Sequence, residues 1–282
     1  MIIWLASYPK SGNTWLRALL SSYYYSHDGI FQFNHLKRIE QFPEKKFFLP
    51  FTENFKTPIS TSQYWISAQN KINGNKEINF FKTHNSLCNI NGNNFTNKKN
   101  TLGCIYIIRD PRNVLTSIKN HYELNYEDSL TFMLNEKKYT YDYFKKNDFG
   151  DFQFISSWKK HYKSWFANKI FDIKLIKYED LLLNTFDTLK ETINFINKIK
   201  NQPDNFDKDK AKNSINSTNF DKLKKKEKEF GFDEAIKSKE NKRKIPFFNL
   251  GPGNEWEKVV PLRLHNQIND YFKKELKELG YK

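Results

Sequence analysis

The sequence predicts one α/β domain, residues 1–282, in which a central parallel β-sheet lies between layers of helices. Short apolar runs typical of buried strands alternate with segments of helical periodicity, which is the pattern of a parallel sheet covered on both faces. The length of 282 residues suits a single large domain. Aromatic residues form 17% of the chain, so a substantial core is available and whole-chain disorder is disfavoured.

Each predicted strand is a short apolar run. The strands are expected at residues 2–8, 77–82, 103–108 and 171–178. The first run ends in a loop that contains Gly12, and apolar residues at helical spacing begin after Thr14. A strand, a glycine-containing loop and a helix in this order present backbone N–H groups to an anion.

Helices are predicted between and after the strands, at residues 111–121, 128–137, 151–168, 185–199 and 261–279. Asp110 and Pro111 suit the N-cap and the first turn of the first of these helices. Residues 23–79 are irregular and aromatic, which predicts loops and short helices over a pocket. Residues 200–246 are rich in Lys, Asn and Asp and are expected to form short surface helices or a mobile flap.

The chain is strongly basic, with 47 Lys and Arg against 32 Asp and Glu and a net charge of +15. Such a balance ordinarily indicates a polyanionic partner. However, 41 of the basic residues are Lys and only 6 are Arg, beside 33 Asn, and Lys and Asn both have A/T-rich codons. We therefore attribute much of the charge to genomic bias and expect attraction to small anions, with no nucleic acid as a partner.

Cysteine content and hydropathy indicate the compartment. Cys88 and Cys104 alone cannot form a disulfide framework or a zinc site. No run of about 18 apolar residues is present, and the N-terminus lacks the basic region of a secretory signal. The sequence therefore predicts a cytoplasmic protein without a transmembrane segment.

The segment from Tyr8 to Trp15 invites comparison with the nucleotide-binding P-loop. That motif needs a lysine directly after its second glycine, whereas Lys10 precedes the only glycine of this loop, Gly12. The loop can still cradle a phosphate through its backbone and through hydroxyl and amide side chains, but it lacks the Mg²⁺ ligands of an ATPase. No metal site is expected, and an ordinary strand-to-helix turn remains the alternative.

Two further groups follow predicted strands. Lys82 and His84 come after the second strand, where open α/β sheets bind ligands. An imidazole can take a proton near neutral pH, and an adjacent cation can stabilise developing negative charge. A lone histidine is more often structural, but Lys10 is expected at the same edge of the sheet.

Two of the six arginines, Arg109 and Arg112, follow the third strand. The guanidinium of Arg109 can fork onto a phosphate, and Ser117 lies two turns into the next helix. The alternative is a surface ion pair of either arginine with an acid such as Asp110. A second anion subsite opposite the first loop would make the ligand a bisphosphate.

In order, these motifs resemble those of the cytosolic-type sulfotransferases. Residues 8–15 resemble the loop that binds the 5′-phosphosulfate, and residues 108–117 resemble the strand and helix that bind the 3′-phosphate. Residues 82–84 match a Lys-Thr-His motif, residues 177–181 match a Tyr-Glu-Asp segment, and residues 217–220 resemble the Thr-x-Phe element beside the adenine. Each motif alone is weak, but five in the family's order are specific.

The resemblance implies a P-loop-NTPase-like fold in three layers and a metal-independent reaction. A sulfuryl group would pass from 3′-phosphoadenosine 5′-phosphosulfate (PAPS) to a hydroxyl or amine, leaving adenosine 3′,5′-bisphosphate (PAP). Lys10 would bind the phosphosulfate, Lys82 would steady the sulfuryl oxygens, and His84 would be the general base. A dianionic leaving group needs fixed positive charge, which lysines and helix N-termini supply in place of Mg²⁺.

The other residues implied by the resemblance surround the donor. The phosphosulfate cradle comprises Ser11, Gly12, Asn13 (where Thr is commoner) and Thr14; the 3′-phosphate site comprises Arg109 and Ser117; the adenine site comprises Trp15, Tyr178, Thr218 and Phe220.

The late loop departs from the family pattern. The family has Arg-Lys-Gly there, with the arginine and the glycine on the 3′-phosphate, whereas this chain has Asn249, Leu250 and Gly251. Asparagine offers a neutral hydrogen bond where arginine offers a charged fork, so weaker 3′-phosphate binding is expected unless the cations at 243–244 compensate. Residues 200–253 are expected to form a lid that includes this loop.

The leading prediction is thus a PAPS-dependent sulfotransferase with a small-molecule or glycan acceptor, and a carbohydrate or glycolipid is favoured by analogy alone. Three alternatives remain open. They are a P-loop kinase-like phosphotransferase, a non-catalytic basic protein that binds anions or glycans through the lysine run at 222–228, and a degenerate relative that has lost PAPS.

Overall fold

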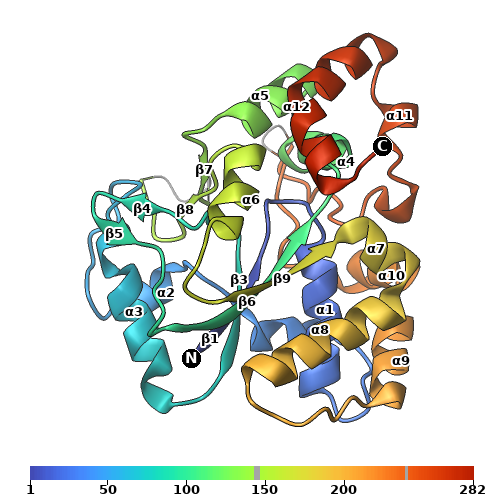
Figure 1. Cartoon of the computed structure of the whole chain (residues 1–282). Coiled ribbons are helices and arrows are strands. Elements are labelled where there is room, and N and C mark those ends of the chain that lie inside the picture. The colour runs from blue at the N-terminus through green and yellow to red at the C-terminus, as the bar shows by residue number, and fades with distance from the viewer. Residues whose placement is uncertain (143–146, 239–240) are drawn as a thin grey trace.

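A five-stranded parallel sheet forms the centre of the computed structural model, which describes residues 1–142, 147–238 and 241–282. The strand order is β2-β3-β1-β6-β9 (Figure 1). The strands are β2 (Glu40–Gln41), β3 (Asn79–Thr83), β1 (Ile2–Ala6), β6 (Thr101–Ile108) and β9 (Asp172–Lys177). The predicted α/β fold with a central parallel sheet is confirmed.

The register of the sheet brings the ends of its strands together. Ala6, the last residue of β1, pairs with Thr83 of β3 and with Tyr106 of β6. The carboxyl ends of these three parallel strands therefore lie at one edge of the sheet. Loops that follow them, including the one with Lys10, meet there.

The sheet has a hydrophobic core on each face. Alternate residues of a strand contribute to the two cores, because successive side chains point to opposite faces. Ile3 and Leu5 pack toward one helix layer, and Trp4 and Ala6 pack toward the other. The first layer comprises α1 (Asn13–Tyr25), α7 (Tyr178–Leu183), α8 (Thr185–Ile199) and α9 (Lys208–Ser217). The second comprises α3 (Trp65–Ile72), α4 (Pro111–Tyr122), α5 (Tyr126–Leu134), α6 (Trp158–Phe166) and α12 (His265–Leu279).

One predicted helix begins later than the sequence suggests. Residues 151–168 were expected to be helical, but α6 starts at Trp158, where Ser157 caps it by accepting a hydrogen bond from the Lys160 N–H. The residues before it form β8 (Gln153–Phe154), which pairs with β7 (Tyr139–Thr140). A second short hairpin, β4 (Asn89–Ile90) and β5 (Asn93–Asn94), was also not predicted. Two-residue strands are too short to show a period.

The irregular segments contain short elements. Residues 23–79 carry, besides β2 and α3, the 3₁₀ turns Phe33–Arg38, Ser62–Tyr64 and Asn73–Asn75 and the helix α2 (Lys45–Phe48). The polar stretch after residue 200 forms α9 and α10 (Phe220–Phe230). The chain then passes through the 3₁₀ turn Gly251–Gly253, α11 (Trp256–Val259) and the 3₁₀ turn Leu262–Leu264 to α12.

Throughout residues 1–142, 147–238 and 241–282, no helix has both the length and the apolar character needed to cross a membrane.

Arg112 of α4 fastens the C-terminal elements to the sheet. Its guanidinium pairs with Asp110 at 2.7 Å, stacks on the ring of Trp256 at 4.6 Å and donates to Asn269 Oδ1 at 3.1 Å. It also donates to the backbone oxygen of Lys282. Arg112 is thus a structural residue: it forms the expected ion pair, but the pair is buried and does not lie at the surface.

Replacing Arg112 with alanine is expected to destabilise the protein by on the order of 3–5 kcal/mol, because the Asp110 carboxylate would stay buried without its cation. Urea unfolding followed by circular dichroism measures this loss. Arg263→Ala is the matched control, since the Arg263–Glu127 pair is exposed on both sides. A loss no larger in R112A than in R263A would contradict the structural role.

Candidate functional site

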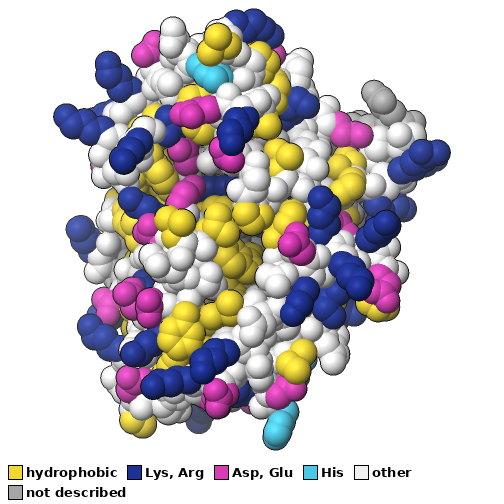
Figure 2. Space-filling model, turned by 90° about the vertical axis from the view of Figure 1, so that its right-hand side faces the viewer, with side chains coloured by type: hydrophobic (Ala, Val, Ile, Leu, Met, Phe, Trp, Pro, Cys, Tyr) yellow, Lys and Arg dark blue, Asp and Glu magenta, His cyan; other side chains and the backbone are white. Residues whose placement is uncertain are grey.

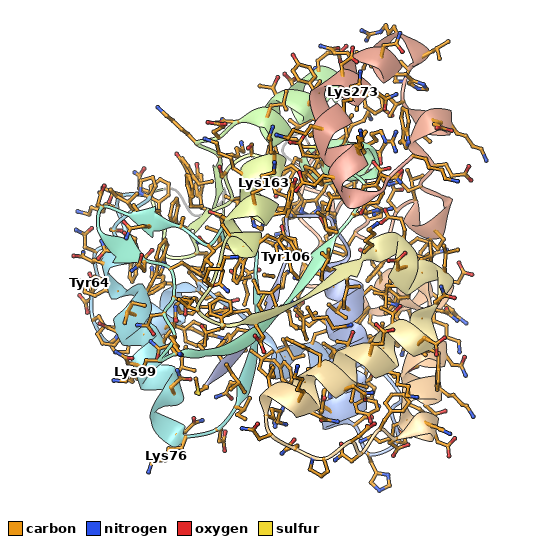
Figure 3. The ribbon with its side chains drawn as sticks, in the orientation of Figure 1. Tyr64, Lys76, Lys99, Tyr106, Lys163 and Lys273 are labelled. Carbon is orange, nitrogen blue, oxygen red and sulfur yellow. The ribbon has the colours of Figure 1, made fainter. Side chains whose placement is uncertain are left out.

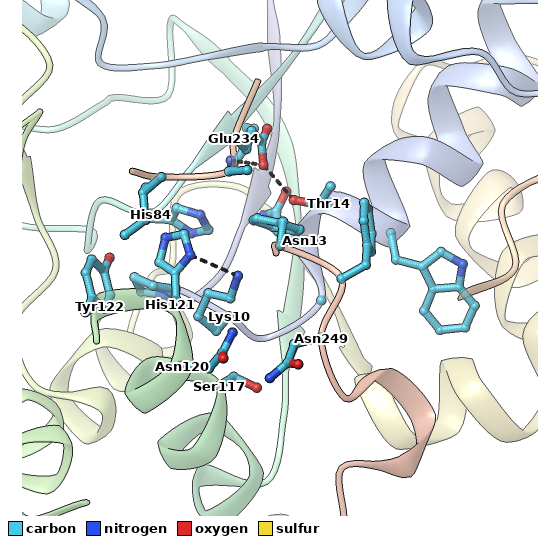
Figure 4. Close-up of a pocket in the computed structure, with 18 of the residues that line it drawn as sticks. Lys10, Asn13, Thr14, His84, Ser117, Asn120, His121, Tyr122, Glu234 and Asn249 are labelled. Carbon is cyan, nitrogen blue, oxygen red and sulfur yellow. Dashed lines mark hydrogen bonds and ion pairs between the residues drawn. The ribbon is translucent and has the colours of Figure 1, made fainter. Parts of the chain in front are cut away.

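One large cavity, of about 1790 Å³, opens at the carboxyl edge of the sheet. The predicted site residues that line it are Lys10, Gly12, Asn13, Thr14, Trp15, Lys82, His84, Arg109, Ser117, Tyr178, Phe220, Asn249, Leu250 and Gly251. Ser11 and Thr218 do not line it. Figure 4 shows side chains from the β1–α1 loop, β3, α4 and the late loop converging on this space.

The loop after β1 has a conformation that depends on glycine. Gly12 has a φ of 102°, and a Cβ there would lie 2.5 Å from the ring of Tyr178. Lys10 also has a positive φ, 66°. Helix α1 begins directly after Gly12 with no acidic residue in its first turn and no side-chain cap, so its N–H groups and positive dipole end are available to an anion.

The side chains of Ser11 and Asn13, where this loop joins α1, are both buried. Asn13 Nδ2 donates to the Leu5 carbonyl at 2.9 Å and to Ser7 Oγ at 3.2 Å. Asn13 therefore braces the loop from within. Ser11 Oγ is buried and finds no hydrogen-bond partner among the residues that the structure describes.

Lys10 lies between two aromatic rings. Its Nζ is 3.5 Å from the centre of the Phe247 ring and 3.5 Å from His121 Nδ1. Burial in the cavity lowers the pKa of Lys10 to about 7; Glu234 opposes this shift and Lys82 adds to it. Its ammonium group therefore loses its proton near neutral pH unless an anion is close.

The backbone of His84 is clamped from both sides. Its N–H donates to Gln153 Oε1 at 2.8 Å, and its carbonyl accepts from His161 Nε2 at 3.0 Å. His161 Nδ1 in turn accepts from the Tyr106 hydroxyl at 2.6 Å. Tyr106 lies at the centre of the molecule, whereas the labelled Lys76, Lys99 and Lys273 lie at its periphery (Figure 3).

The same geometry fixes the tautomer of His84. Its Nδ1 lies 2.9 Å from the Ser7 carbonyl oxygen, which can only accept, so Nδ1 carries the proton. The lone pair is then on Nε2. Burial, followed by the nearby Lys82, lowers the pKa of His84 to about 3, so the imidazole is neutral at physiological pH.

Lys82 is paired with an acid that the sequence did not suggest. Its Nζ lies 3.1 Å from Glu234 Oε2, and the Thr14 hydroxyl donates to the same oxygen at 2.8 Å. Arg17 pairs with Glu234 Oε1 at 2.6 Å. Desolvation would raise the pKa of Glu234, but the two cations outweigh it and hold that pKa well below its usual range.

Arg109 is unlike Arg112. Its guanidinium stacks on the Tyr178 ring at 4.1 Å, and within the described part of the chain no acid lies at ion-pair distance from it. Its Nε is buried without a hydrogen-bond partner there. Ser117 Oγ accepts from Asn254 Nδ2 at 3.3 Å. Both residues line the cavity. Arg109 Nε is an unused donor, whereas the Ser117 hydroxyl donates to the Asn113 carbonyl at 3.1 Å and would have to leave it to bind an anion.

The remaining predicted residues differ in how they meet the cavity. Trp15 and Tyr178 meet edge to face, with ring centres 5.8 Å apart. Gly251, with a φ of 56°, lies against Phe220, whose ring a Cβ would approach to 2.3 Å. Thr218 is fully buried and donates to the Ser214 carbonyl at 2.8 Å, which makes it part of the end of α9.

The late loop brings no cation of its own to the cavity. Leu250 is 40% exposed, and the Asn249 carbonyl accepts from Lys224. The cations suggested as compensation, Arg243 and Lys244, do not line the cavity, whereas Lys237 and Lys242 do.

Figure 2 shows the face at the right of Figure 1. Hydrophobic side chains gather there in a central hollow, and Lys and Arg side chains lie around it.

Four residues at or beside the site were not predicted: Arg17, His121, Glu234 and Asn254. Arg17 follows Thr14 by three residues, and His121 follows Ser117 by four, so the helical period placed both beside predicted residues. Glu234 had no such signal, since it lies 220 residues from Thr14. Asn254 follows the late loop at 249–251 by three residues.

Comparison with known proteins shows the family and the fold. The family model described as sulfotransferase domain matches residues 2–280. No protein of curated function matches the chain by sequence.

Three solved structures are similar in fold. The mouse sulfotransferase SULT7A1, complexed with PAP, is 18% identical, with a TM-score of 0.57 over 98% of this chain and 84% of that one. Retinol dehydratase with androsterone and the inactive cofactor PAP is 14% identical, with a TM-score of 0.59 over 98% and 80%. Retinol dehydratase with retinol and PAP is 15% identical, with a TM-score of 0.56 over 98% and 81%.

The tautomer and pKa of His84 can be tested directly. The imidazole should remain neutral and protonated at Nδ1 down to about pH 4, because the Ser7 carbonyl holds that proton and the pKa lies at about 3. Long-range ¹H–¹⁵N spectra distinguish the tautomers, and His84→Asn assigns the resonance. A signal of the Nε2-protonated form, or titration near the ordinary histidine value of about 6.5, would contradict this geometry.

Proposed function

Because this chain belongs to the sulfotransferase domain family, we propose that it transfers a sulfuryl group from PAPS to a hydroxyl of its acceptor, with His84 as the general base. The observation that carries the proposal is the meeting of Lys10, Lys82 and His84 in one cavity, close enough that Lys82 lowers the pKa of the other two. Two cationic side chains beside a neutral imidazole suit the transfer of an anionic group.

The cavity has features that fit the donor. Its volume of about 1790 Å³ exceeds what a nucleotide needs. Arg109 lines the cavity, and its Nε is a buried polar atom without a partner in the described chain; such atoms are rare unless a ligand satisfies them. The rings of Trp15 and Tyr178 offer apolar surface for a base. Arg109 would hold the 3′-phosphate, and the adenine would lie against the rings of Trp15 and Tyr178. The 5′-phosphosulfate would lie at the N-terminus of α1, beside Lys10 and Thr14, which line the cavity.

PAPS, when bound, supplies an activated sulfuryl group on a phosphate leaving group. Lys10 and the N-terminus of α1 would stabilise the negative charge that builds up on the phosphate side. Lys82 would hold the sulfuryl oxygens and draw charge from the sulfur. Because both lysines act as fixed charges, neither role requires a metal ion.

His84 would take the acceptor's proton at Nε2 as the new sulfur–oxygen bond forms. Its clamped backbone and its hydrogen bond to Ser7 hold the ring in one orientation, so Nε2 need not search for the acceptor. A pKa of about 3 keeps Nε2 free of a proton before reaction. A bound dianion would raise that pKa and so favour the imidazolium that forms.

The proposed acceptor is a carbohydrate or the sugar of a glycolipid. The part of the cavity beyond His84 combines aromatic and polar side chains, namely Tyr122, Phe132, Tyr139, Tyr141, Glu44, Lys45, Asp151 and Gln153. Rings that stack on a sugar face, together with groups that accept and donate hydrogen bonds, are what a polyol requires. We also propose a cytoplasmic location and no nucleic-acid partner.

Of residues 200–253, we propose as lid only 218–238 and 241–253, which follow α9; residues 239–240 lie outside the described part of the chain. Ser214 of α9 donates to the Leu19 carbonyl of α1 at 2.9 Å, so that helix belongs to the layer beneath. Beyond it, Glu227 accepts from the backbone N–H groups of Phe247 and Phe248 at 2.7 and 2.9 Å. This attachment joins α10 to the segment that covers Lys10.

His84→Asn should reduce sulfuryl transfer at least about a hundredfold, because general bases contribute about 10²–10⁴-fold. PAP affinity should remain within about threefold of the original, since His84 is assigned no contact with PAP. Labelled PAPS with a panel of sugars and glycolipids measures the first quantity, and calorimetry with PAP measures the second.

The control for this experiment is ADP, with and without Mg²⁺. Metal-independent PAP binding at least about tenfold tighter than ADP, some 1.4 kcal/mol, is expected from the site at Arg109 and Ser117. Equal affinity for the two nucleotides would contradict a 3′-phosphate site, and Mg²⁺-dependent ATP turnover would favour the kinase-like alternative.

Lys10 predicts a pH dependence. In the free protein the pKa of Lys10 is about 7, so below pH 7 the ammonium group is already present. A bound anion raises the pKa of Lys10. Above pH 7, Lys10 must therefore take up a proton when the anion binds. PAP affinity should therefore fall as the pH rises from 7 to 9, by up to about tenfold per unit. In Lys10→Arg, which stays charged, this fall should be absent.

Calorimetry of both forms across this pH range isolates Lys10, because the ionisation of PAP itself affects both equally. Parallel pH profiles for the two forms would show that Lys10 does not titrate there.

A further inference from the structure

Glu234 is a carboxylate at the centre of the proposed transfer machinery. Its Oε2 lies 3.1 Å from Lys82 Nζ and accepts from the Thr14 hydroxyl at 2.8 Å, and its Oε1 lies 2.6 Å from Arg17 (Figure 4). These three partners come from β3 and from one face of α1. Glu234 itself lies after α10, in a segment that belongs neither to the central sheet nor to a helix.

The contacts of Glu234 are those that the donor's anionic end requires. The family resemblance implies that Thr14 belongs to the phosphosulfate cradle, and the proposed function assigns the Lys82 ammonium to the sulfuryl oxygens. A single oxygen of Glu234 takes both groups. Two negatively charged oxygens cannot share that position in a site shielded from water, since their repulsion is poorly screened there.

We propose, resting on the proposed function, that Glu234 is an internal anion that occupies the sulfuryl end of the donor site and leaves it when the donor binds. The cation cluster then has a counter-charge in both states: the carboxylate before binding, and the donor's own charge after it. The residue thereby sets specificity, because a ligand must bring negative charge of its own to replace the carboxylate.

Two side chains cover the lysines of the site: Glu234 covers Lys82, and Phe247 covers Lys10. The Ile245 N–H donates to the Ile236 carbonyl at 2.8 Å. This bond joins the residues just after Glu234 to the residues just before Phe247. Phe247 covers Lys10 at 3.5 Å. Because both covering side chains belong to one hydrogen-bonded segment, release of Glu234 from Lys82 is expected to uncover Lys10 as well.

The test compares Glu234→Gln with Glu229→Gln. Both substitutions remove one negative charge from the same region, but Glu229 is exposed on α10 and does not line the cavity. Calorimetry with PAPS in the absence of acceptor should show E234Q binding at least about tenfold tighter than the unmodified protein, about 1.4 kcal/mol. E229Q should bind within about threefold of it.

A second measurement uses inorganic sulfate and no nucleotide. Sodium sulfate should raise the melting temperature of E234Q more than that of the unmodified protein or of E229Q, against sodium chloride at equal ionic strength. The vacated cation cluster would then bind the added anion, whereas the general effect of sulfate on burial acts on all three forms alike.

The two measurements separate failure of this inference from failure of the proposed function. PAPS binding that is unchanged or weaker in E234Q, without extra stabilisation by sulfate, would overturn the role of Glu234 and leave the donor assignment standing. Stabilisation of E234Q by sulfate with no PAPS binding by any form would support the internal anion and overturn PAPS as the donor.

Glu234→Asp keeps the test decisive if E234Q does not fold. The shorter side chain retains its charge but reaches Lys82 and Arg17 less well, so PAPS should bind at least about threefold tighter than to the unmodified protein. Unchanged or weaker binding by E234D would overturn the inference.

Discussion

Lys10, Lys82 and Arg109 bring positive charge into one cavity, where water cannot solvate it as it does at the surface. The unusual properties of the site follow from this electrostatic constraint. It depresses the pKa of Lys10, adds to the depression at His84 and holds Glu234 ionised. A cavity of this kind favours any ligand that brings negative charge, and a sulfuryl nucleotide brings it at two places.

The fold was largely predictable because its signals are local. The predicted run at 103–108 contains no charged or strongly polar residue, so its burial in β6 is evident in the sequence itself, and β6 lies between two other strands. β7 and β8 were not predicted because a two-residue strand shows no hydrophobic period. Residues expected to form the first turns of α6 form part of that hairpin instead. The predicted lid at 200–253 shows the same limit of local sequence signals. The polar composition of these residues does not reveal that α9 packs on α1.

The site residues that lie at the carboxyl ends of strands were predictable from their positions in the sequence. Lys82 lies at the carboxyl end of β3, His84 follows that strand directly and Arg109 follows β6, so sheet register alone brings them together. What orients them was not predictable. Gln153 and His161 clamp His84 across 69 and 77 residues of sequence, and such contacts exist only once the two layers have packed.

The lowered pKa of Lys10 also has a chemical consequence. A neutral amine is a nucleophile and an ammonium group is not, so a lysine whose pKa is about 7 presents a large reactive fraction at neutral pH. Acylating reagents that enter the cavity would therefore modify this side chain preferentially. A bound dianion would restore the proton and quench the reactivity, so that covalent labelling at Lys10 becomes a reporter of whether the cavity is occupied.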